Sequence, residues 1–141
     1  MSPIRENREI ELLLPEGWPR PSGYSQGVLA KGRYVFVAGQ VGWNPITNLF
    51  ETEDFIGQIR QSLLNIVAVL GKAGAEPRHI VRLTWFITHL DNYKNFQTAI
   101  GETYAEIIGR HYPAMSVVVV DELLESNAKV EIEATAIIPE P

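Results

Sequence analysis

Apolar residues recur three or four positions apart in two segments, which is the spacing of one face of an α-helix. The first segment runs from Ile56 to Leu70 and the second from Phe96 to Ile108. Residues with capping chemistry flank both, namely Thr52 and Asp91 before them and Gly71, Gly74 and Gly109 after them. The pattern therefore predicts two amphipathic helices that each bury one face.

Strand-like patterns occur in four other segments. Apolar and polar residues alternate from Ile80 to Leu90 and from Lys129 to Ala136, which is the two-residue period of a strand with one buried face. The continuous apolar run from Val117 to Val120 is typical of a strand buried on both faces. Ile10 to Leu14 are predicted to form a short edge strand.

Glycine and proline predict the connections between these elements. Gly32 separates two β-prone runs, Tyr24–Ala30 and Tyr34–Ala38, which predicts a hairpin. The segment Pro15–Gly23 holds three prolines and two glycines, and it is expected to be a loop because proline removes a backbone donor. Gln40–Asn48 is also predicted to be a loop.

The predicted order after the leading strand is β-β-α-β-α-β-β, which indicates an α+β fold with a mixed sheet and both helices on one face. The other face would carry Phe86, Thr135 and half of the valine run. A monomer rarely exposes that much apolar surface. We therefore expect copies of the chain to associate through this face, with closed symmetry.

Composition narrows the class of protein. The 141 residues suit one domain, 1–141, with residues 1–23 as an N-terminal extension. The net charge is −5 and the twelve Lys and Arg residues are scattered, which disfavours binding to nucleic-acid phosphates. No cysteine is present, which excludes thiol chemistry. No signal-peptide core and no run of roughly 18 apolar residues occurs, so a cytoplasmic protein is expected.

Few side chains offer catalytic chemistry. His79, His89 and His111 lack a partner at metal-ligand spacing, so a metal site is not expected. His79 and His89 are expected to have surface or capping roles. Neither a Gly-x-Ser-x-Gly elbow nor a phosphate-binding glycine loop is present. Glu131 remains, opposite the helix-facing residues of its strand. It is either a solvated or paired acid, or a proton donor and acceptor in a subunit cleft. Glu133 shares its face, and one of the two acids is expected to be exposed.

Six short motifs follow one another along the chain: Tyr24-Ser-Gln-Gly-Val28, Val37-Ala-Gly-Gln40, Leu64-Asn-Ile-Val-Ala-Val-Leu70, Ala73-Gly74, Pro113-Ala-Met-Ser116 and Val130-Glu-Ile-Glu-Ala134. In this order and spacing they resemble the RidA family, also called YjgF or endoribonuclease L-PSP. The resemblance extends from about Tyr24 to Ile138, which is nearly the whole chain.

The resemblance implies a chorismate-mutase-like α+β subunit and a homotrimer with three clefts between subunits. It also implies hydrolysis of reactive enamines and imines, such as 2-aminoacrylate, to a ketoacid and ammonia, with no cofactor or metal. In this reading Glu131 orients the attacking water. The residues expected to bind substrate are Tyr24, Ala38, Gly39, Met115 and Val117.

The chain departs from the family at the arginine of the motif Pro-Ala-Arg-Ser. That arginine binds the substrate carboxylate through two hydrogen bonds, and Met115 stands in its place. Losing such a contact costs on the order of 2–5 kcal/mol. Ala38 also stands where relatives often have Ser, and Gly101 where they often have Asn. The usual amino-acid-derived substrates are therefore disfavoured, unless another cation such as Arg82 serves the cleft.

Three functions stay open from the sequence. The first is an enamine or imine deaminase of altered specificity, for a less charged or larger substrate such as a ring-cleavage product of the 2-aminomuconate type. The second is a trimer that binds a small molecule or a protein without turnover. RNA cleavage or translation inhibition is the third, and the acidic charge counts against it.

Overall fold

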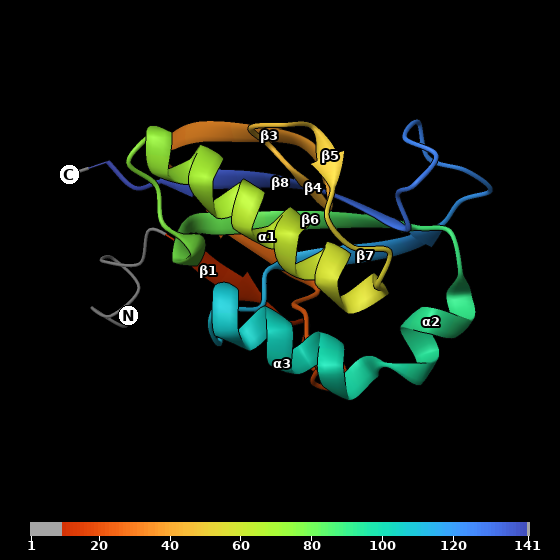
Figure 1. Ribbon diagram of the computed structural model, residues 1–141. Helices are drawn as coiled ribbons and strands as arrows, with labels where there is room; N and C mark the ends of the chain where they lie inside the picture. Colours follow the sequence, from red (N-terminus) through yellow and green to blue (C-terminus); the bar gives the residue numbers. More distant parts are fainter. Residues whose placement is uncertain (1–9, 141) are drawn as a thin grey trace.

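The computed structural model describes residues 10–140, so the first nine residues of the predicted N-terminal extension lie outside the described part. Eight strands, three α-helices and one 3₁₀ helix follow one another in this part (Figure 1). They are β1 (Ile10–Leu13), β2 (Gly27–Ala30), β3 (Arg33–Val41), β4 (Trp43–Asn44), β5 (Leu49–Phe50), α1 (Phe55–Lys72), η2 (Pro77–His79), β6 (Ile80–Ile87), α2 (Leu90–Asn95), α3 (Gln97–Ile107), β7 (Ala114–Val119) and β8 (Val130–Ile138).

A four-stranded sheet in the order β3-β8-β6-β7 carries the helices. β8 runs antiparallel to both β3 and β6, whereas β7 runs parallel to β6. α1 packs on β3 and β8, and α3 packs along α1. In Figure 1, α1 crosses in front of the sheet and α3 lies below α1. The prediction of an α+β fold with a mixed sheet and helices on one face is confirmed.

The core lies between α1 and the sheet. The predicted stripe of α1 is fully buried through Ile59, Leu63, Ile66 and Leu70. The apolar members of both alternating strands are buried as well, namely Leu83, Trp85, Ile87, Val130, Ile132, Ala134 and Ala136. Each large apolar side chain stabilises the fold by about 1.5–3 kcal/mol when it is buried. This burial drives the apolar stripe of α1 onto the apolar side of the sheet.

The start of α1 differs from the prediction. Asp54 is the N-cap residue, and its Oδ2 accepts a hydrogen bond from the Gly57 N–H at 2.9 Å. The hydroxyl of Thr52 instead accepts the Asp54 N–H at 3.0 Å. The prediction of Thr52 as the N-cap residue is wrong, because its hydroxyl oxygen is used in the turn before the helix. α1 ends at Lys72, and Gly74, with a φ of 78°, follows it as expected.

The second predicted helix is divided into α2 and α3. Phe96 separates them with a non-helical backbone. Asp91 lies within the first turn of α2, so its predicted role as N-cap residue is wrong. α2 buries no residue, whereas α3 buries Ile100 and Tyr104, so only α3 is held on the core. No helix of residues 10–140 is long and apolar enough to cross a membrane.

The strand pairing also differs from the prediction. β2 pairs with β1 and not with β3, so the hairpin predicted around Gly32 is wrong. Gly32 has a φ of 151°, and a Cβ there would come within 2.1 Å of the Ile138 carbonyl oxygen. This close approach sets the start of β3 against the end of β8, its antiparallel partner. The predicted loop Gln40–Asn48 contains the end of β3 and also β4, which pairs with β5.

The face of the sheet away from α1 carries exposed apolar side chains, as the alternation predicted. Phe36 is 73% exposed, Tyr34 is 61% exposed and Val118 is 42% exposed. Phe86 and Thr135 lie on this face too, and both are half-buried. We call this surface the open face. Val119, on the other face of β7, is 48% exposed, so in the single chain the valine run is not buried on both faces as predicted.

Candidate functional site

The first group of predicted site residues lies where β3 meets β8. The pairing register shifts between Val37 and Gln40, so Ala38 and Gly39 form a β-bulge. The Gln40 side chain donates a hydrogen bond from Nε2 to the Ala38 carbonyl oxygen at 3.1 Å, which holds the bulge. Bulges re-aim side chains and are frequent beside active sites.

Glu131 lies against this bulge. A Cβ added to Gly39 would come within 2.8 Å of both Cδ and Oε2 of Glu131, so only glycine leaves room for the carboxylate in this place. Glu131 is half-buried, whereas Glu133 is exposed, as expected for one of the two acids. No ion pair within residues 10–140 involves Glu131, so its oxygens stay available for a water molecule or a substrate.

A hollow of about 430 Å³ opens beside the bulge. It is lined by residues of β3, β6 and β8, including Phe36, Ala38, Arg82 and Glu133. Arg82 is exposed, and it lies across the sheet from Thr135, on the open face. The candidate replacement cation therefore lies on the bulge side of the sheet, in a hollow that Glu133 lines, and not with Met115.

The second group of predicted site residues lies at the start of β7. Ser25 donates its backbone N–H to the Pro113 carbonyl oxygen at 2.9 Å and its hydroxyl to the Tyr112 carbonyl oxygen. A parallel β-bridge also joins Ser25 to Ala114. These contacts hold Tyr24, which is 38% exposed, beside the opening of β7. Sequence reasoning gave Ser25 no role, although its place inside the Tyr24 motif was the available signal.

Met115 and Val117 face the helix side of the sheet. In the register of β6 and β7 they lie opposite Leu83 and Trp85, which are both buried. Met115 is half-buried and packs against the core. It also borders a cavity on that side of the sheet, so it is a core residue and a cavity wall together.

A single chain cannot bring the two groups into one site. Met115 is on β7 and Glu131 is on β8, with β6 between them, and the two side chains face opposite sides of the sheet. Neighbouring strands lie about 4.8 Å apart, so the two backbones are separated by roughly 10 Å. β3 and β7 are the two edges of the sheet. A site that uses both groups therefore requires a second copy of the chain.

The comparison with protein families agrees with this arrangement of motifs. The model of the family described as endoribonuclease L-PSP matches residues 19–138, which is most of the chain. The chain belongs to the endoribonuclease L-PSP family. This is the Rid or YjgF family that the six motifs indicated, so that resemblance is confirmed.

Solved Rid-family structures share the fold. YyfB from Yersinia pestis, a protein of the Rid family, is 32% identical with a TM-score of 0.81, over 93% of this chain and 100% of that chain. TdcF of E. coli, solved with bound serine, is 33% identical with a TM-score of 0.65, over 91% of this chain and 98% of that chain.

Curated relatives of the Rid family are similar over most of their length. A RutC family protein of Pyrococcus horikoshii is 34% identical over 127 residues, 89% of this chain and 96% of the relative. The 2-iminobutanoate/2-iminopropanoate deaminase of Dermatophagoides farinae is 35% identical over 121 residues, 85% of this chain and 90% of the relative.

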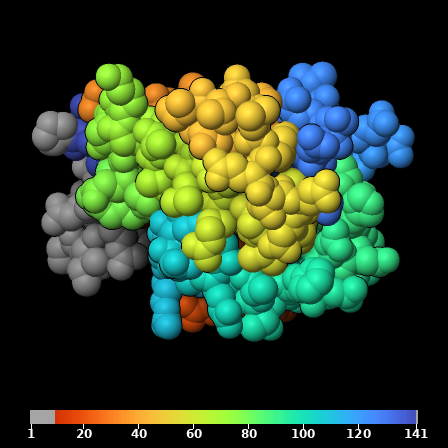
Figure 2. Space-filling model, viewed as in Figure 1, coloured from red at the N-terminus to blue at the C-terminus, as the bar shows by residue number. Residues whose placement is uncertain are grey.

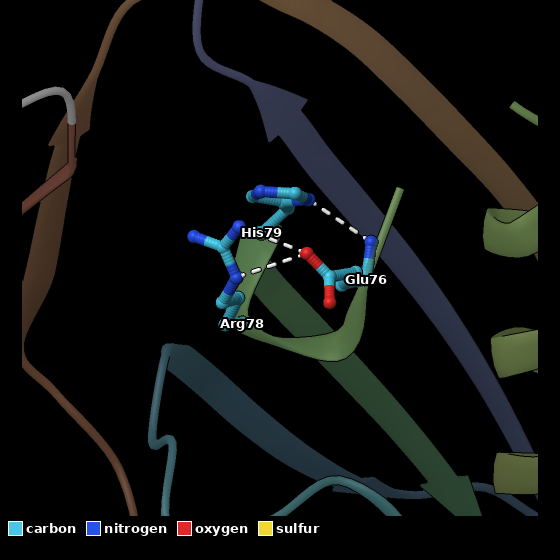
Figure 3. Close-up of polar contacts among 3 residues, drawn as sticks. All are labelled: Glu76, Arg78 and His79. Atoms are coloured by element: carbon cyan, nitrogen blue, oxygen red, sulfur yellow. Dashed lines mark hydrogen bonds and ion pairs between the residues drawn. The ribbon is translucent and has the colours of Figure 1, made fainter. Parts of the chain in front are cut away.

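Two histidines of this Rid-family chain support its backbone. His79 accepts the Glu76 N–H at Nδ1 over 2.9 Å and so caps η2, while Arg78 donates to the Glu76 carboxylate at 2.8 Å (Figure 3). Burial, with a smaller effect of Arg78, lowers the pKa of His79. His111 Nε2 lies 2.6 Å from the Ile80 carbonyl oxygen. Within residues 10–140 no three His, Cys, Asp or Glu side chains gather as a metal site requires.

Proposed function

We propose that this chain hydrolyses a reactive enamine or imine to a carbonyl compound and ammonia. The observation that supports it most is the half-buried Glu131 carboxylate, held against Gly39 by the bulge of β3. The relative from Dermatophagoides farinae, a 2-iminobutanoate/2-iminopropanoate deaminase, also supports the proposal. Glu131 is the general acid and base of this proposal.

The proposed reaction needs one proton-transferring group. Glu131 takes a proton from water as the water oxygen attacks the imine carbon, and returns it to nitrogen to give a neutral carbinolamine. The same carboxylate then takes the hydroxyl proton of the carbinolamine and passes it to nitrogen, so that the carbonyl forms as the C–N bond breaks and ammonia leaves. An enamine enters this sequence after proton transfer to its carbon has formed the imine. Water and substrate supply every atom of the products, so no cofactor is required.

The proposal includes a trimer with a cleft at each contact between subunits. Glu131, Gly39 and Ala38 on one copy would meet Tyr24, Met115 and Val117 on the next. Two facts support it: β6 separates the strand of Glu131 from the strand of Met115, and their side chains face opposite sides of the sheet; and Phe36 and Val118 leave the open face apolar and exposed. A surface of that kind usually marks an interface.

Met115 sets the proposed specificity. A thioether has no charge and accepts hydrogen bonds weakly, so it cannot replace a bidentate arginine for a carboxylate next to the imine. The proposed substrates are imines whose group at this end is larger or less charged than in 2-iminopropanoate. Arg82 would meet such a substrate only from the β3–β8 side.

The test is ammonia release from imines generated in place by an amino-acid oxidase acting on small, branched and aromatic amino acids. Glu131→Gln is expected to lower the rate by about 10²–10⁴-fold, the usual contribution of a general acid and base. Glu102→Gln is the control, since it removes an exposed acid that lies on α3, away from the bulge. Equal rates for Glu131→Gln and wild type would reject Glu131 as the catalytic residue.

Binding without turnover is the second candidate function, and the uncharged Met115 is the observation that favours it. It predicts metabolites that raise the melting temperature while no imine yields ammonia above the spontaneous rate. Release of ammonia that depends on Glu131 would decide against it.

A further inference from the structure

A cavity of about 590 Å³ lies on the helix side of the sheet, between the Pro-rich loop (residues 15–23), α3 and the β6–β7 edge. Figure 2 shows atoms of the N-terminal segment, in red, beneath α3. Cavities that bind small molecules commonly measure about 300–1,000 Å³. Its apolar wall consists of Trp85, Tyr93, Tyr104, Tyr112 and Met115.

The aromatic wall is fixed by contacts of its own. Tyr104 and Tyr112 stack with ring centroids 5.7 Å apart and planes inclined by 17°. The Tyr104 hydroxyl donates to the His111 carbonyl oxygen at 2.6 Å, so its polar end is already satisfied. The thioether of Met115 makes favourable contacts with aromatic rings. Such a wall suits a flat, apolar ligand body.

One formal charge borders the cavity. Of the described residues that line the cavity, only Arg20, on the Pro-rich loop, carries a charge. No Asp or Glu is among these residues. None of the ion pairs within residues 10–140 involves Arg20. Burial raises the pKa of Tyr93 and of Tyr104, so both phenols stay neutral near pH 7. On a chain of net charge −5, this cavity is a local site of positive charge and attracts an anion.

Trp85 supplies a second polar group at the cavity. The Trp85 side chain is 2% exposed. Among residues 10–140, its Nε1–H is the one buried side-chain polar group without a hydrogen-bond partner. Buried indole N–H groups normally have an acceptor. Trp85 lines the cavity, but its Nε1 is closed to solvent in this structure, so an acceptor atom of a ligand reaches it only when the ring moves on binding.

We propose that this cavity binds a small molecule with a flat apolar body and one anionic group, such as an aromatic carboxylic acid. The rings and Met115 hold the body, Arg20 attracts the anion, and the Trp85 N–H donates to an oxygen. The site shares Met115 with the proposed cleft, but it does not depend on turnover. Binding alone tests it, and a failure here leaves the Glu131 experiment untouched.

The first experiment titrates the full chain with phenylacetate and with phenylacetamide, which has the same shape and no charge. Calorimetry is expected to give saturable binding of phenylacetate, with a dissociation constant on the order of 1 mM, and roughly tenfold weaker binding of the amide. The Trp85 indole signal in the ¹H–¹⁵N spectrum is assigned as the one that is missing in Trp85→Phe. It should shift as phenylacetate saturates the site, while the indole signals of Trp18 and Trp43 stay in place.

Two variants with matched controls separate the parts of the proposal. Arg20→Gln should weaken phenylacetate to the level of the amide, whereas Arg110→Gln, an exposed residue of the neighbouring cavity, should not. Gly101 lines this cavity, and a Cβ there would meet no atom within 4 Å. Gly101→Leu should therefore fill the cavity and abolish binding, whereas Gly71→Leu, also at an uncrowded helical glycine, should not.

Three results would overturn the proposal. The first is no saturable binding of phenylacetate to wild type. The second is equal binding of acid and amide, or an Arg20→Gln variant that binds phenylacetate as wild type does. The third is an unmoved Trp85 indole signal at saturation. Arg20 and Gly101 are exposed, so loss of binding in their variants cannot be ascribed to an unfolded core.

Discussion

The two ends of the proposed cleft differ in how tightly they are packed. At the β3–β8 end, a Cβ on Gly39 would come within 2.8 Å of the Glu131 carboxylate. Beside β7, a Cβ on Gly101 would meet nothing within 4 Å, and Met115 borders a cavity of about 590 Å³. Gly39 is exposed and Glu131 is half-buried, so an added methyl group at Gly39 displaces the carboxylate, whereas one at Gly101 displaces nothing. The tight end therefore suits a fixed reacting group, and the roomy end suits a group that selects among ligands.

Crowding the tight end should have the largest effect on activity. Gly39→Ala is expected to displace the Glu131 carboxylate and lower kcat by about 10²-fold, since misplacing a catalytic group by about 1 Å costs that much. KM should change less than kcat, because Met115 and Tyr24 are untouched and only the Gly39 side of the cleft is altered. Steady-state ammonia release measures both. Gly71→Ala is the matched control, because a Cβ there meets nothing within 4 Å and Gly71 lies away from both ends; a Gly39→Ala enzyme as fast as that control would contradict the comparison.

A charge on the open face should weaken the assembly of copies and so separate the two ends of the cleft, which belong to different copies. Phe36→Glu places a carboxylate on a residue that is 73% exposed in the single chain. The dissociation constant of the assembly is expected to rise roughly thirtyfold or more, as for loss of a central interface residue. Sedimentation at several protein concentrations measures it. Leu124→Glu, at a loop residue that is 95% exposed, should assemble normally; identical behaviour of the two variants would place the interface elsewhere.

Changing the roomy end should alter which substrate is used. Met115→Arg restores a cation to the start of β7, and the rate with 2-iminopropanoate is expected to rise on the order of tenfold through a lower KM. Met115→Leu, which keeps the volume and lacks the charge, should not show the gain. If both variants respond alike, β7 does not set specificity.

The patterns that were predicted correctly are those that burial enforces along one element. The stripe of α1 and the alternation in β6 and β8 needed no knowledge of partners, because each element buries one side whatever lies against it. The face of Glu131 followed from the same alternation.

Features that depend on distant parts of the chain were not predicted. The hairpin around Gly32 failed because β3 gains a longer partner in β8, far along the chain. Thr52 and Asp54 both have capping chemistry, and only the path of the chain before α1 decides between them. That Met115 and Glu131 face opposite sides of the sheet depends on the register of β6 with both β7 and β8. Nothing local to Arg20 shows that its loop reaches the cavity beside Met115.

Replacing His79 should have the smallest of the predicted effects. It should change the stability of the fold, and His79 lies away from both ends of the proposed cleft. Its Nδ1 accepts the Glu76 N–H, and burial lowers its pKa below the ordinary 6.5. The stabilisation is therefore present in full above pH 6.5 and is lost as pH falls through the lower folded value. The difference in unfolding free energy between wild type and His79→Asn should shrink on acidification, in denaturant titrations at one protein concentration. His111, which also affects this pKa, is held constant. A difference independent of pH would reject neutral His79 as the cap.

Complementation between two inactive variants tests most directly whether the site is built from two copies of the chain. Glu131→Gln removes the β3–β8 end, and Tyr24→Asp places a charge in the wall at the β7 end. Co-expressed in equal amounts, they would form clefts in which about one in four combines two intact ends, because each copy offers one of its ends to each neighbour. The account predicts recovery of about a quarter of wild-type activity in the mixed assembly. Activity no higher than that of either variant alone, in an assembly shown to be mixed, would contradict it.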